Sequence, residues 1–237
     1  MKKQDSWKII WNSKIENSKK KSSLKDLINL NGYDSHSAKI STKEWYKYTN
    51  FFVNKFKLKP PNSILDIGCG SGAFLYPFYK KNISCYGLDY SSSLIKICKK
   101  NMPKGNFYAS EASNLKKLKK YNFDFIFISS VFQYFPNLAY AKKVIKQLKF
   151  ISKQNTKIFI LDVPDTNKQN RWIKYIKEVI GYRSYMAQYG NLKHYWYNRK
   201  TLKNIIQKEN FKVKIFDQKL IKKPNSKFRF NAFVEKI

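Results

Sequence analysis

Acidic and glycine residues in the middle of the chain have the types and spacing of a site for a small organic ligand. The run Asp66-Ile67-Gly68-Cys69-Gly70-Ser71-Gly72 directly follows the apolar segment 63–65. Glycines let the backbone turn sharply and approach a ligand closely, and a helix that follows them points its N-terminus at that ligand. With Ala73 the run also satisfies G-x-G-x-x-A, so on this motif alone a dinucleotide-binding fold is possible. The motif does not decide between a dinucleotide and another small ligand.

Two further acids follow later apolar segments. Asp89 comes about 20 residues after the glycine run, where a carboxylate can accept hydrogen bonds from both hydroxyls of a ribose. Glu111 and Ala112 follow the next apolar segment, where an acid and a backbone amide can bind the edge of an adenine. The chain has only 15 acids, so three of them after successive apolar segments favour a nucleotide-like ligand at one edge of a sheet.

The elements that must position these residues alternate along the chain from residue 63 onward. Expected strands are 64–67, 83–88, 106–109, 123–128, 157–161, 211–216 and 228–234, and expected helices are 73–80, 91–101, 113–119, 138–152, 172–180 and 198–209. Apolar strands that alternate with helices predict parallel β-α-β units, so we expect a doubly wound, mostly parallel α/β sheet. The last two expected strands can pair as an antiparallel hairpin at the sheet edge.

The 237 residues are long enough for one large domain, and we see no linker that would divide them. Residues 1–60 read as a helical N-terminal cap, in which Ser41-Thr42-Lys43-Glu44 is a capping-box pattern that opens a helix. We therefore expect a cap or lid over 1–60 and a core domain over 61–237, with a lid insertion at about 163–197.

These motifs resemble the class I S-adenosylmethionine-dependent methyltransferases. The similarity rests on residues 64–72, 87–91 and 123–136 and covers about 60–162 well. It implies a seven-stranded Rossmann-like sheet with an antiparallel C-terminal pair, and S-adenosylmethionine as the methyl donor, with S-adenosylhomocysteine as its product. A nicotinamide enzyme is less similar, because its glycine motif does not usually carry an acid where Asp66 stands.

The resemblance also implies roles for single residues. The implied cofactor-binding set is Asp66, Gly68, Cys69, Gly70, Gly72, Asp89, Tyr90, Glu111, Ala112, Ser129 and Ser130. In this set Asp66 orients the cofactor's amino group, Asp89 holds the ribose, and Glu111 holds the adenine. Many relatives carry acids or histidines after the fourth strand, whereas this chain has Gln133 and Tyr134, so the catalytic base is open.

An alcohol acceptor needs a general base to remove its proton. The candidates are His36 and His194, the two histidines of the chain, and Asp162 at the end of the fifth expected strand. The expected substrate-binding residues are Tyr33, Asp34, Tyr134 and Tyr195. Asp162 with Asp165 could suggest a metal site, but no cluster of acids or histidines supports one, and we expect no metal.

Three weaker cues concern the acceptor. Residues 7–11, 27–34 and 228–232 resemble methyltransferases found with bacterial surface-polysaccharide pathways. This implies O-methylation of a sugar, a nucleotide-linked sugar or a phosphate-bearing capsule substituent. The aromatic residues of 182–197 could stack on a sugar face, or pack the lid against the core.

The net charge of +33 is typical of nucleic-acid binders, but its make-up weakens that interpretation. Only four of the 48 basic residues are arginines, the residue type that recognises phosphates and bases with two hydrogen bonds. A small-molecule or glycan acceptor is therefore favoured over nucleic acid. The alternatives are an RNA methyltransferase and a non-catalytic adenosyl-binding scaffold protein.

Three cysteines without metal-ligand spacing favour a reducing compartment, and we expect a cytoplasmic protein. No apolar segment has the length of a membrane span or the pattern of a signal peptide. The oligomeric state is not determined by the sequence.

Overall fold

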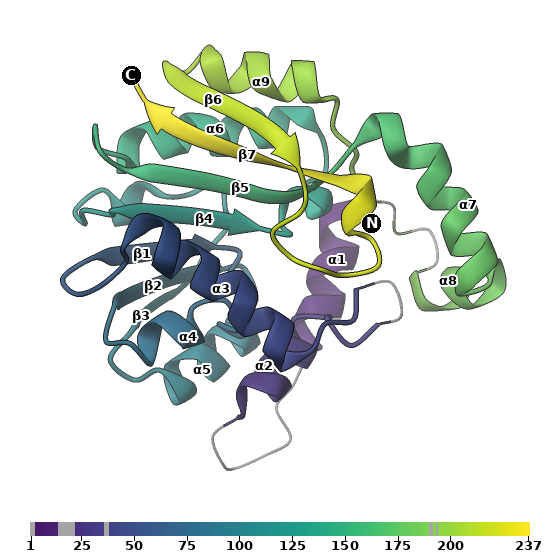
Figure 1. The fold of residues 1–237 in the computed structure, drawn as a ribbon, viewed down its shortest axis with the longest axis horizontal. Coiled ribbons are helices and arrows are strands. Elements are labelled where there is room, and N and C mark those ends of the chain that lie inside the picture. Colours follow the sequence, from purple (N-terminus) through teal and green to yellow (C-terminus); the bar gives the residue numbers. More distant parts are fainter. Residues whose placement is uncertain (1–2, 14–21, 36–37, 190–191, 193) are drawn as a thin grey trace.

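A seven-stranded sheet forms the centre of the protein in the computed structural model, which describes residues 3–13, 22–35, 38–189, 192 and 194–237 (Figure 1). The strands are β1 (Ser63–Ile67), β2 (Ser84–Asp89), β3 (Asn106–Ala109), β4 (Phe125–Ser129), β5 (Lys157–Pro164), β6 (Phe211–Asp217) and β7 (Arg229–Lys236). Their spatial order is β3-β2-β1-β4-β5-β7-β6. The first five are parallel, and β7 runs antiparallel to both β5 and β6. The expected α/β fold with an antiparallel C-terminal hairpin is confirmed.

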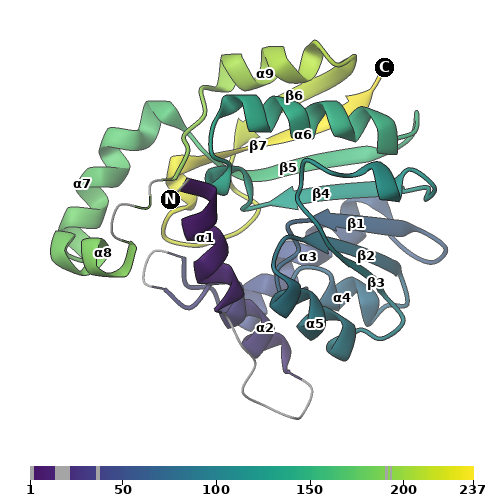
Figure 2. The ribbon, with the colours of Figure 1, turned by 180° about the vertical axis from the view of Figure 1, so that it is seen from behind.

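Helices cover both faces of this sheet. They are α1 (Lys3–Asn12), α2 (Leu24–Leu30), α3 (Thr42–Phe56), α4 (Tyr76–Tyr79), α5 (Ser92–Asn101), α6 (Leu138–Ile151), α7 (Gln169–Val179), α8 (Tyr182–Tyr189) and α9 (Arg199–Gln207). In Figure 1 α3 lies in front of the sheet, and Figure 2 shows α6 on the opposite face. Helix α1 lies at the carboxyl ends of the parallel strands in both views.

The alternating side chains of the central strands explain this three-layer arrangement. Phe125 and Phe127 of β4 belong to the apolar cluster that holds residues of α2, α3, α4 and α5. Ile126 and Ile128 point the other way, into the cluster with α6 and α9. Successive side chains of a strand face opposite sides of the sheet, so a strand buried on both faces is apolar throughout.

Some elements differ from the expectation. The helix expected over 73–80 is shorter in the structure, where only α4 is helical. A proline lies at its start, and since proline lacks an N–H and is tolerated only in the first turn, the helix cannot begin much earlier. The segment 113–119 forms a short 3₁₀ turn, Lys116–Leu118. At the start of α3 one half of the expected capping box is formed, in which Ser41 accepts the Glu44 N–H, while Glu44 instead accepts the Lys47 ammonium.

Cap residues and core residues share one apolar cluster, to which α2 contributes Leu27 and α3 contributes Phe52. The division into a cap, a core and a lid insertion stays a prediction. Within the described ranges, no helix is both long and apolar enough to cross a bilayer. The same residues contain no group of three or more acids, histidines and cysteines that could hold a metal ion.

Candidate active site

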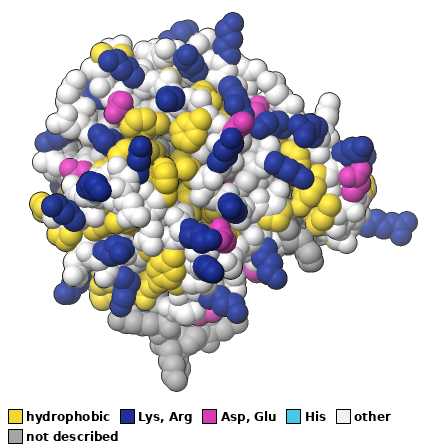
Figure 3. All heavy atoms as spheres, in the orientation of Figure 1, with side chains coloured by type: hydrophobic (Ala, Val, Ile, Leu, Met, Phe, Trp, Pro, Cys, Tyr) yellow, Lys and Arg dark blue, Asp and Glu magenta, His cyan; other side chains and the backbone are white. Residues whose placement is uncertain are grey.

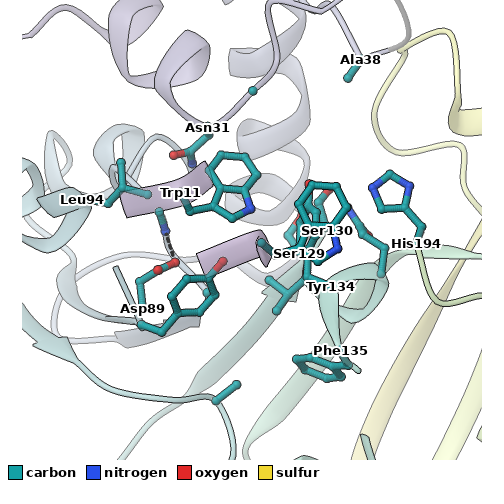
Figure 4. Close-up of a pocket in the computed structure, with 18 of the residues that line it drawn as sticks. Trp11, Asn31, Ala38, Asp89, Leu94, Ser129, Ser130, Tyr134, Phe135 and His194 are labelled. Atoms are coloured by element: carbon teal, nitrogen blue, oxygen red, sulfur yellow. Dashed lines mark hydrogen bonds between the residues drawn. The ribbon is translucent and has the colours of Figure 1, made fainter. Parts of the chain in front are cut away.

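A cavity opens at the carboxyl ends of the parallel strands and has an empty volume of ≈ 1170 Å³, including open solvent at its mouth (Figure 4). Open parallel sheets bind ligands at this edge, where the strand order reverses. Eleven of the residues expected from the sequence line it: Tyr33, Gly68, Gly70, Asp89, Tyr90, Glu111, Ala112, Ser129, Ser130, Tyr134 and His194. Residues from the carboxyl ends of β1, β2, β3 and β4 and from the N-terminal segment thus meet around one space.

The glycine turn after β1 is fitted closely to the end of α2. Gly70 has a φ of 54°, and a Cβ on it would lie 2.3 Å from Asn31 Oδ1. That oxygen accepts the Ser71 N–H at 2.7 Å, so Asn31 fixes the turn from outside. A Cβ on Gly68 would lie 2.4 Å from the side chain of Val131, which lines the cavity. Only glycine combines this backbone with these close approaches.

Asp89 ends β2 and joins the turn to the next helix. Its Oδ2 accepts the Gly70 N–H and its Oδ1 accepts the Ser91 N–H, both at 2.9 Å. Burial raises the pKa of this carboxyl to about 6, although the backbone donors oppose the shift. Asp89 lines the cavity, and its carboxylate oxygens keep lone pairs with which they can accept hydrogen bonds from a ligand.

Glu111 and Tyr90 supply the polar atoms beside Asp89. The Tyr140 hydroxyl donates to Glu111 Oε2 at 2.9 Å, and Lys8 Nζ of α1 lies 3.6 Å from Glu111 Oε1. The Tyr90 hydroxyl is buried and has no hydrogen-bond partner within the described ranges of the chain. A buried hydroxyl without a partner is costly unless a ligand or water satisfies it.

Other expected residues lie outside the cavity lining. Asp66 is buried at the end of β1, where burial and the charge of Asp89 raise its pKa well above the usual range. Cys69 is buried, and a Cβ added to Gly72 would collide with the side chain of Met102 in the interior. Asp34 is exposed, Tyr195 packs against Tyr197, and His36 lies outside the described residues. Their functional roles stay predictions.

The end of the cavity near β5 is built around Asp162. The Tyr33 hydroxyl donates to Ser130 Oγ at 2.8 Å, and Ser130 Oγ donates to Asp162 Oδ2 at 2.6 Å. Lys223 Nζ donates to the same carboxylate oxygen at 2.6 Å. Asp162 sits where the pairing of β5 with β7 shifts register, with a φ of 62°, and such irregularities redirect a side chain.

This environment keeps Asp162 ionised. Burial acts to raise the pKa of the carboxyl, but the charges of Lys223 and Arg229 outweigh it, and the pKa lies below the usual value. A low pKa makes a carboxylate a weak base. Asp162 itself does not line the cavity and reaches it through Ser130.

Aromatic rings cover the cavity from the side of α1. The ring of Trp7 stacks on His194 with centroids 5.3 Å apart, and its edge meets Tyr134 at 4.8 Å. Trp11 of the same helix contacts Tyr134 at 5.5 Å. In Figure 4, His194 and Tyr134 lie next to each other beside Ser130. Helix α1 therefore packs its rings against Tyr134 and His194, which line the cavity.

The family of the chain follows from its sequence as a whole. The family model described as "Methyltransferase domain" matches residues 37–214. The chain belongs to this family. The expected S-adenosylmethionine-dependent methyltransferase, with its class I fold, is thereby confirmed.

Solved structures of similar fold include three that cover most of this methyltransferase. The PH0226 protein of Pyrococcus horikoshii has a TM-score of 0.66 and 13% identity, and the match covers 87% of this chain and 99% of that one. A methyltransferase of Clostridium acetobutylicum has a TM-score of 0.62 and 14% identity, over 87% and 96%. Magnesium protoporphyrin IX methyltransferase of Synechocystis, solved with bound SAM, has a TM-score of 0.61 and 11% identity, over 100% and 98%.

One curated relative is more similar in sequence. The methyltransferase is 31% identical over 132 residues to the nonribosomal peptide synthetase TES of Alternaria alternata. That match covers 53% of this chain and 2% of the much longer synthetase.

Several residues of the methyltransferase cavity were not expected from the sequence. They are Trp7, Trp11, Asn31, Leu94, Gln133, Tyr140, Lys223, Asn225 and Arg229, among others. Asn31 lies in the segment 27–34, which the sequence marks only by a resemblance, and Gln133 is marked only as a departure from the family pattern. Lys223 is one lysine of many, and nothing in its local sequence distinguishes it. Its burial in a chain of exposed lysines appears only in the folded protein.

Proposed function

We propose that this methyltransferase O-methylates a small polar acceptor, with a sugar, a nucleotide-linked sugar or a phosphate-bearing substituent of a surface polysaccharide as the acceptor class. One observation carries the proposal: a single cavity extends from the acids that follow β2 and β3 to an end near β5 that is closed by Tyr33, Ser130 and aromatic rings. The first part suits an adenosyl group. The second part carries hydroxyl groups and aromatic rings, which suit an acceptor with hydroxyl groups.

The cavity residues fit the cofactor by their chemistry. The carboxylates of Asp89 and Glu111 can accept hydrogen bonds from ribose hydroxyls and an adenine amine, and the unpartnered Tyr90 hydroxyl can join them. Gly68 and Gly70 line the cavity with bare backbone, and a Cβ on either would collide with Val131 or Asn31. When bound, S-adenosylmethionine supplies a methyl group on a positively charged sulfur.

The chain's own residues then position the acceptor and exclude water. Alignment of the attacking oxygen with the methyl group in a closed site can supply much of the rate. Trp7 and Trp11 close the cavity, and Ser130 and Tyr33 can orient an acceptor hydroxyl. Of the described base candidates, His194 lines the cavity, whereas Asp162 is ion-paired behind Ser130. We therefore assign proton removal to His194.

On the face of the molecule drawn in Figure 3, the distribution of charge favours a small acceptor over RNA. Figure 3 shows lysine and arginine side chains scattered across that face, separated by apolar and uncharged groups. RNA-binding enzymes instead gather basic side chains in one patch.

A transfer assay tests the proposal. The purified protein is incubated with methyl-labelled S-adenosylmethionine and, in separate reactions, with neutral sugars, nucleotide-linked sugars, sugar phosphates and RNA. We expect label on a sugar-class acceptor and none on RNA. Label on RNA alone would establish the rival activity, and cofactor binding without transfer to any acceptor would support the scaffold alternative.

A further inference from the structure

Two buried cations line the cavity, and both are paired with one buried carboxylate oxygen, Asp162 Oδ2, which lies 2.6 Å from Lys223 Nζ and 3.8 Å from Arg229 Nη1. The side chains of Lys223, Arg229 and Asp162 are only 2%, 3% and 1% exposed. Lys223 and Arg229 line the cavity, and Asp162 lies directly behind them. Their charges sum to one surplus positive charge. Burying an unpaired charge costs several kcal/mol, so this surplus calls for an anionic partner.

The hydrogen bonds of Arg229 show that part of its guanidinium is unused. Its Nη1 donates to Gln133 Oε1 at 3.0 Å and to the Asp162 carbonyl at 3.1 Å. Its Nε is buried and has no hydrogen-bond partner among the residues that the structure describes. A guanidinium presents its donors as a planar fork that matches the two oxygens of a carboxylate or phosphate.

The strand order separates this pair from the adenosyl end. Arg229 begins β7 and Lys223 lies in the loop before it, beside β5. Asp89 and Glu111 follow β2 and β3, on the other side of β1 and β4. At about 4.8 Å between neighbouring strands, the two groups stand several strands apart. The cations thus belong to the acceptor end of the cavity.

We infer that Lys223 and Arg229 form a subsite for an acidic group, a carboxylate or a phosphate, carried by the methyl acceptor. This inference rests on the proposed function, since it assumes that the cofactor occupies the end with Asp89. An acceptor that carries such a group is bound by charge as well as by shape. A neutral analogue of the same size leaves Arg229 Nε without a partner.

A charge series tests the subsite. Lys223→Gln removes one positive charge, Asp162→Asn removes the negative charge, and the double variant restores the original sum. Glucuronate, glucose 1-phosphate and glucose are titrated into each protein, with and without S-adenosylhomocysteine, using the fluorescence of Trp7 and Trp11 in the cavity. Lys222→Gln is the matched control, because Lys222 is exposed and lies outside the cavity.

We expect the affinity for one of the two anions to weaken about tenfold in Lys223→Gln, which corresponds to ~1.4 kcal/mol. The affinity for the same anion should tighten in Asp162→Asn and return near the wild-type value in the double variant. The anion that follows the series identifies carboxylate or phosphate, and glucose stays unaffected. Unchanged S-adenosylhomocysteine affinity and melting temperature show that each variant is folded, and the double variant keeps the test valid if a single one is not.

Two results would overturn the subsite. If neither anion follows the series, the pair serves only the fold. If S-adenosylhomocysteine binding follows the series while methylthioadenosine binding does not, the cations hold the cofactor's own carboxylate. If wild type binds neither adenosyl compound, the proposed function fails, and the titrations without cofactor still judge the anion site.

Discussion

The carboxylate of Asp89 accepts the backbone N–H of Gly70 across 2.9 Å and so joins the end of β2 to the glycine turn after β1. The same carboxylate also accepts the N–H of Ser91, which begins the next helix. One ionisable group therefore holds together the glycine turn and the strand end to which we assign cofactor binding. Its protonation and its removal are the most informative perturbations of the site.

Cofactor affinity should depend on pH through Asp89. The pKa of this carboxyl is raised to about 6, so it is ionised above that pH and protonated below it. Only the ionised form accepts hydrogen bonds at both oxygens. At pH 5 about a tenth is ionised, so we expect the Kd for S-adenosylhomocysteine to be roughly tenfold higher at pH 5 than at pH 7.5. Calorimetry across this range measures it, with Asp89→Asn as the pH-independent control.

The free energy of unfolding should also depend on pH through Asp89, but it should fall with rising pH, whereas cofactor affinity rises. The pKa in the folded protein is higher than the ordinary 3.8, so the folded state binds the proton more tightly than the unfolded state does. The contribution of Asp89 to the free energy of unfolding therefore falls as pH rises from about 4 to 6. Urea unfolding of wild type and Asp89→Asn between about pH 4 and 6 isolates the contribution of Asp89 to the free energy of unfolding. A difference that grew more favourable to wild type with rising pH would contradict the assignment.

Gly70→Ala should disturb the turn by two separable effects. Its φ of 54° costs an alanine about 1 kcal/mol, and the new Cβ would collide with Asn31. We expect a loss of about 2 kcal/mol in unfolding free energy and weaker cofactor binding. Gly181→Ala is the matched control, because Gly181 has a φ of 74° but open space around it. Equal losses in both variants would mean that the contact with Asn31 does not matter.

His194→Ala should lower turnover far more than cofactor affinity. The imidazole lines the cavity and stacks on Trp7, so its loss removes the assigned base while leaving the adenosyl end intact. Loss of a general base typically costs a factor of about 10² to 10⁴ in kcat. Steady-state kinetics and a cofactor titration separate the two effects. Full activity in this variant would remove His194 from the mechanism and return attention to Asp162 and to His36.

The fold was largely predictable because its signals are local. In continuous apolar strands such as β4 and amphipathic helices such as α6, the pattern of apolar residues in the segment itself predicts which side chains are buried. The sequence could not show that the strand nearest β5 is β7 rather than β6, because that pairing depends on contacts between segments far apart in the chain. Helix α4 was overestimated because the proline near its start limits where it begins.

The site residues that belong to a sequence motif could be predicted. Those that become distinctive only through burial in the folded protein could not. Asp89 and the glycines are recognised by spacing, and they line the cavity. Lys223 is chemically one lysine among many, and it becomes distinctive only through its pairing with Asp162 in the interior. The covering of the cavity by Trp7 likewise depends on where α1 packs, which its own sequence does not specify.

Calorimetric titration of S-adenosylhomocysteine into wild type and Asp89→Asn at pH 7.5 tests the central claim most directly, namely that the cofactor lies against the carboxyl ends of β1, β2 and β3. Asp34→Asn, which changes an exposed carboxylate off the cavity, is the control. We predict micromolar-range binding to wild type and to the control, and a loss of at least about tenfold in Asp89→Asn, whose cooperative thermal unfolding shows that it is folded. Wild-type affinity in Asp89→Asn would contradict the account.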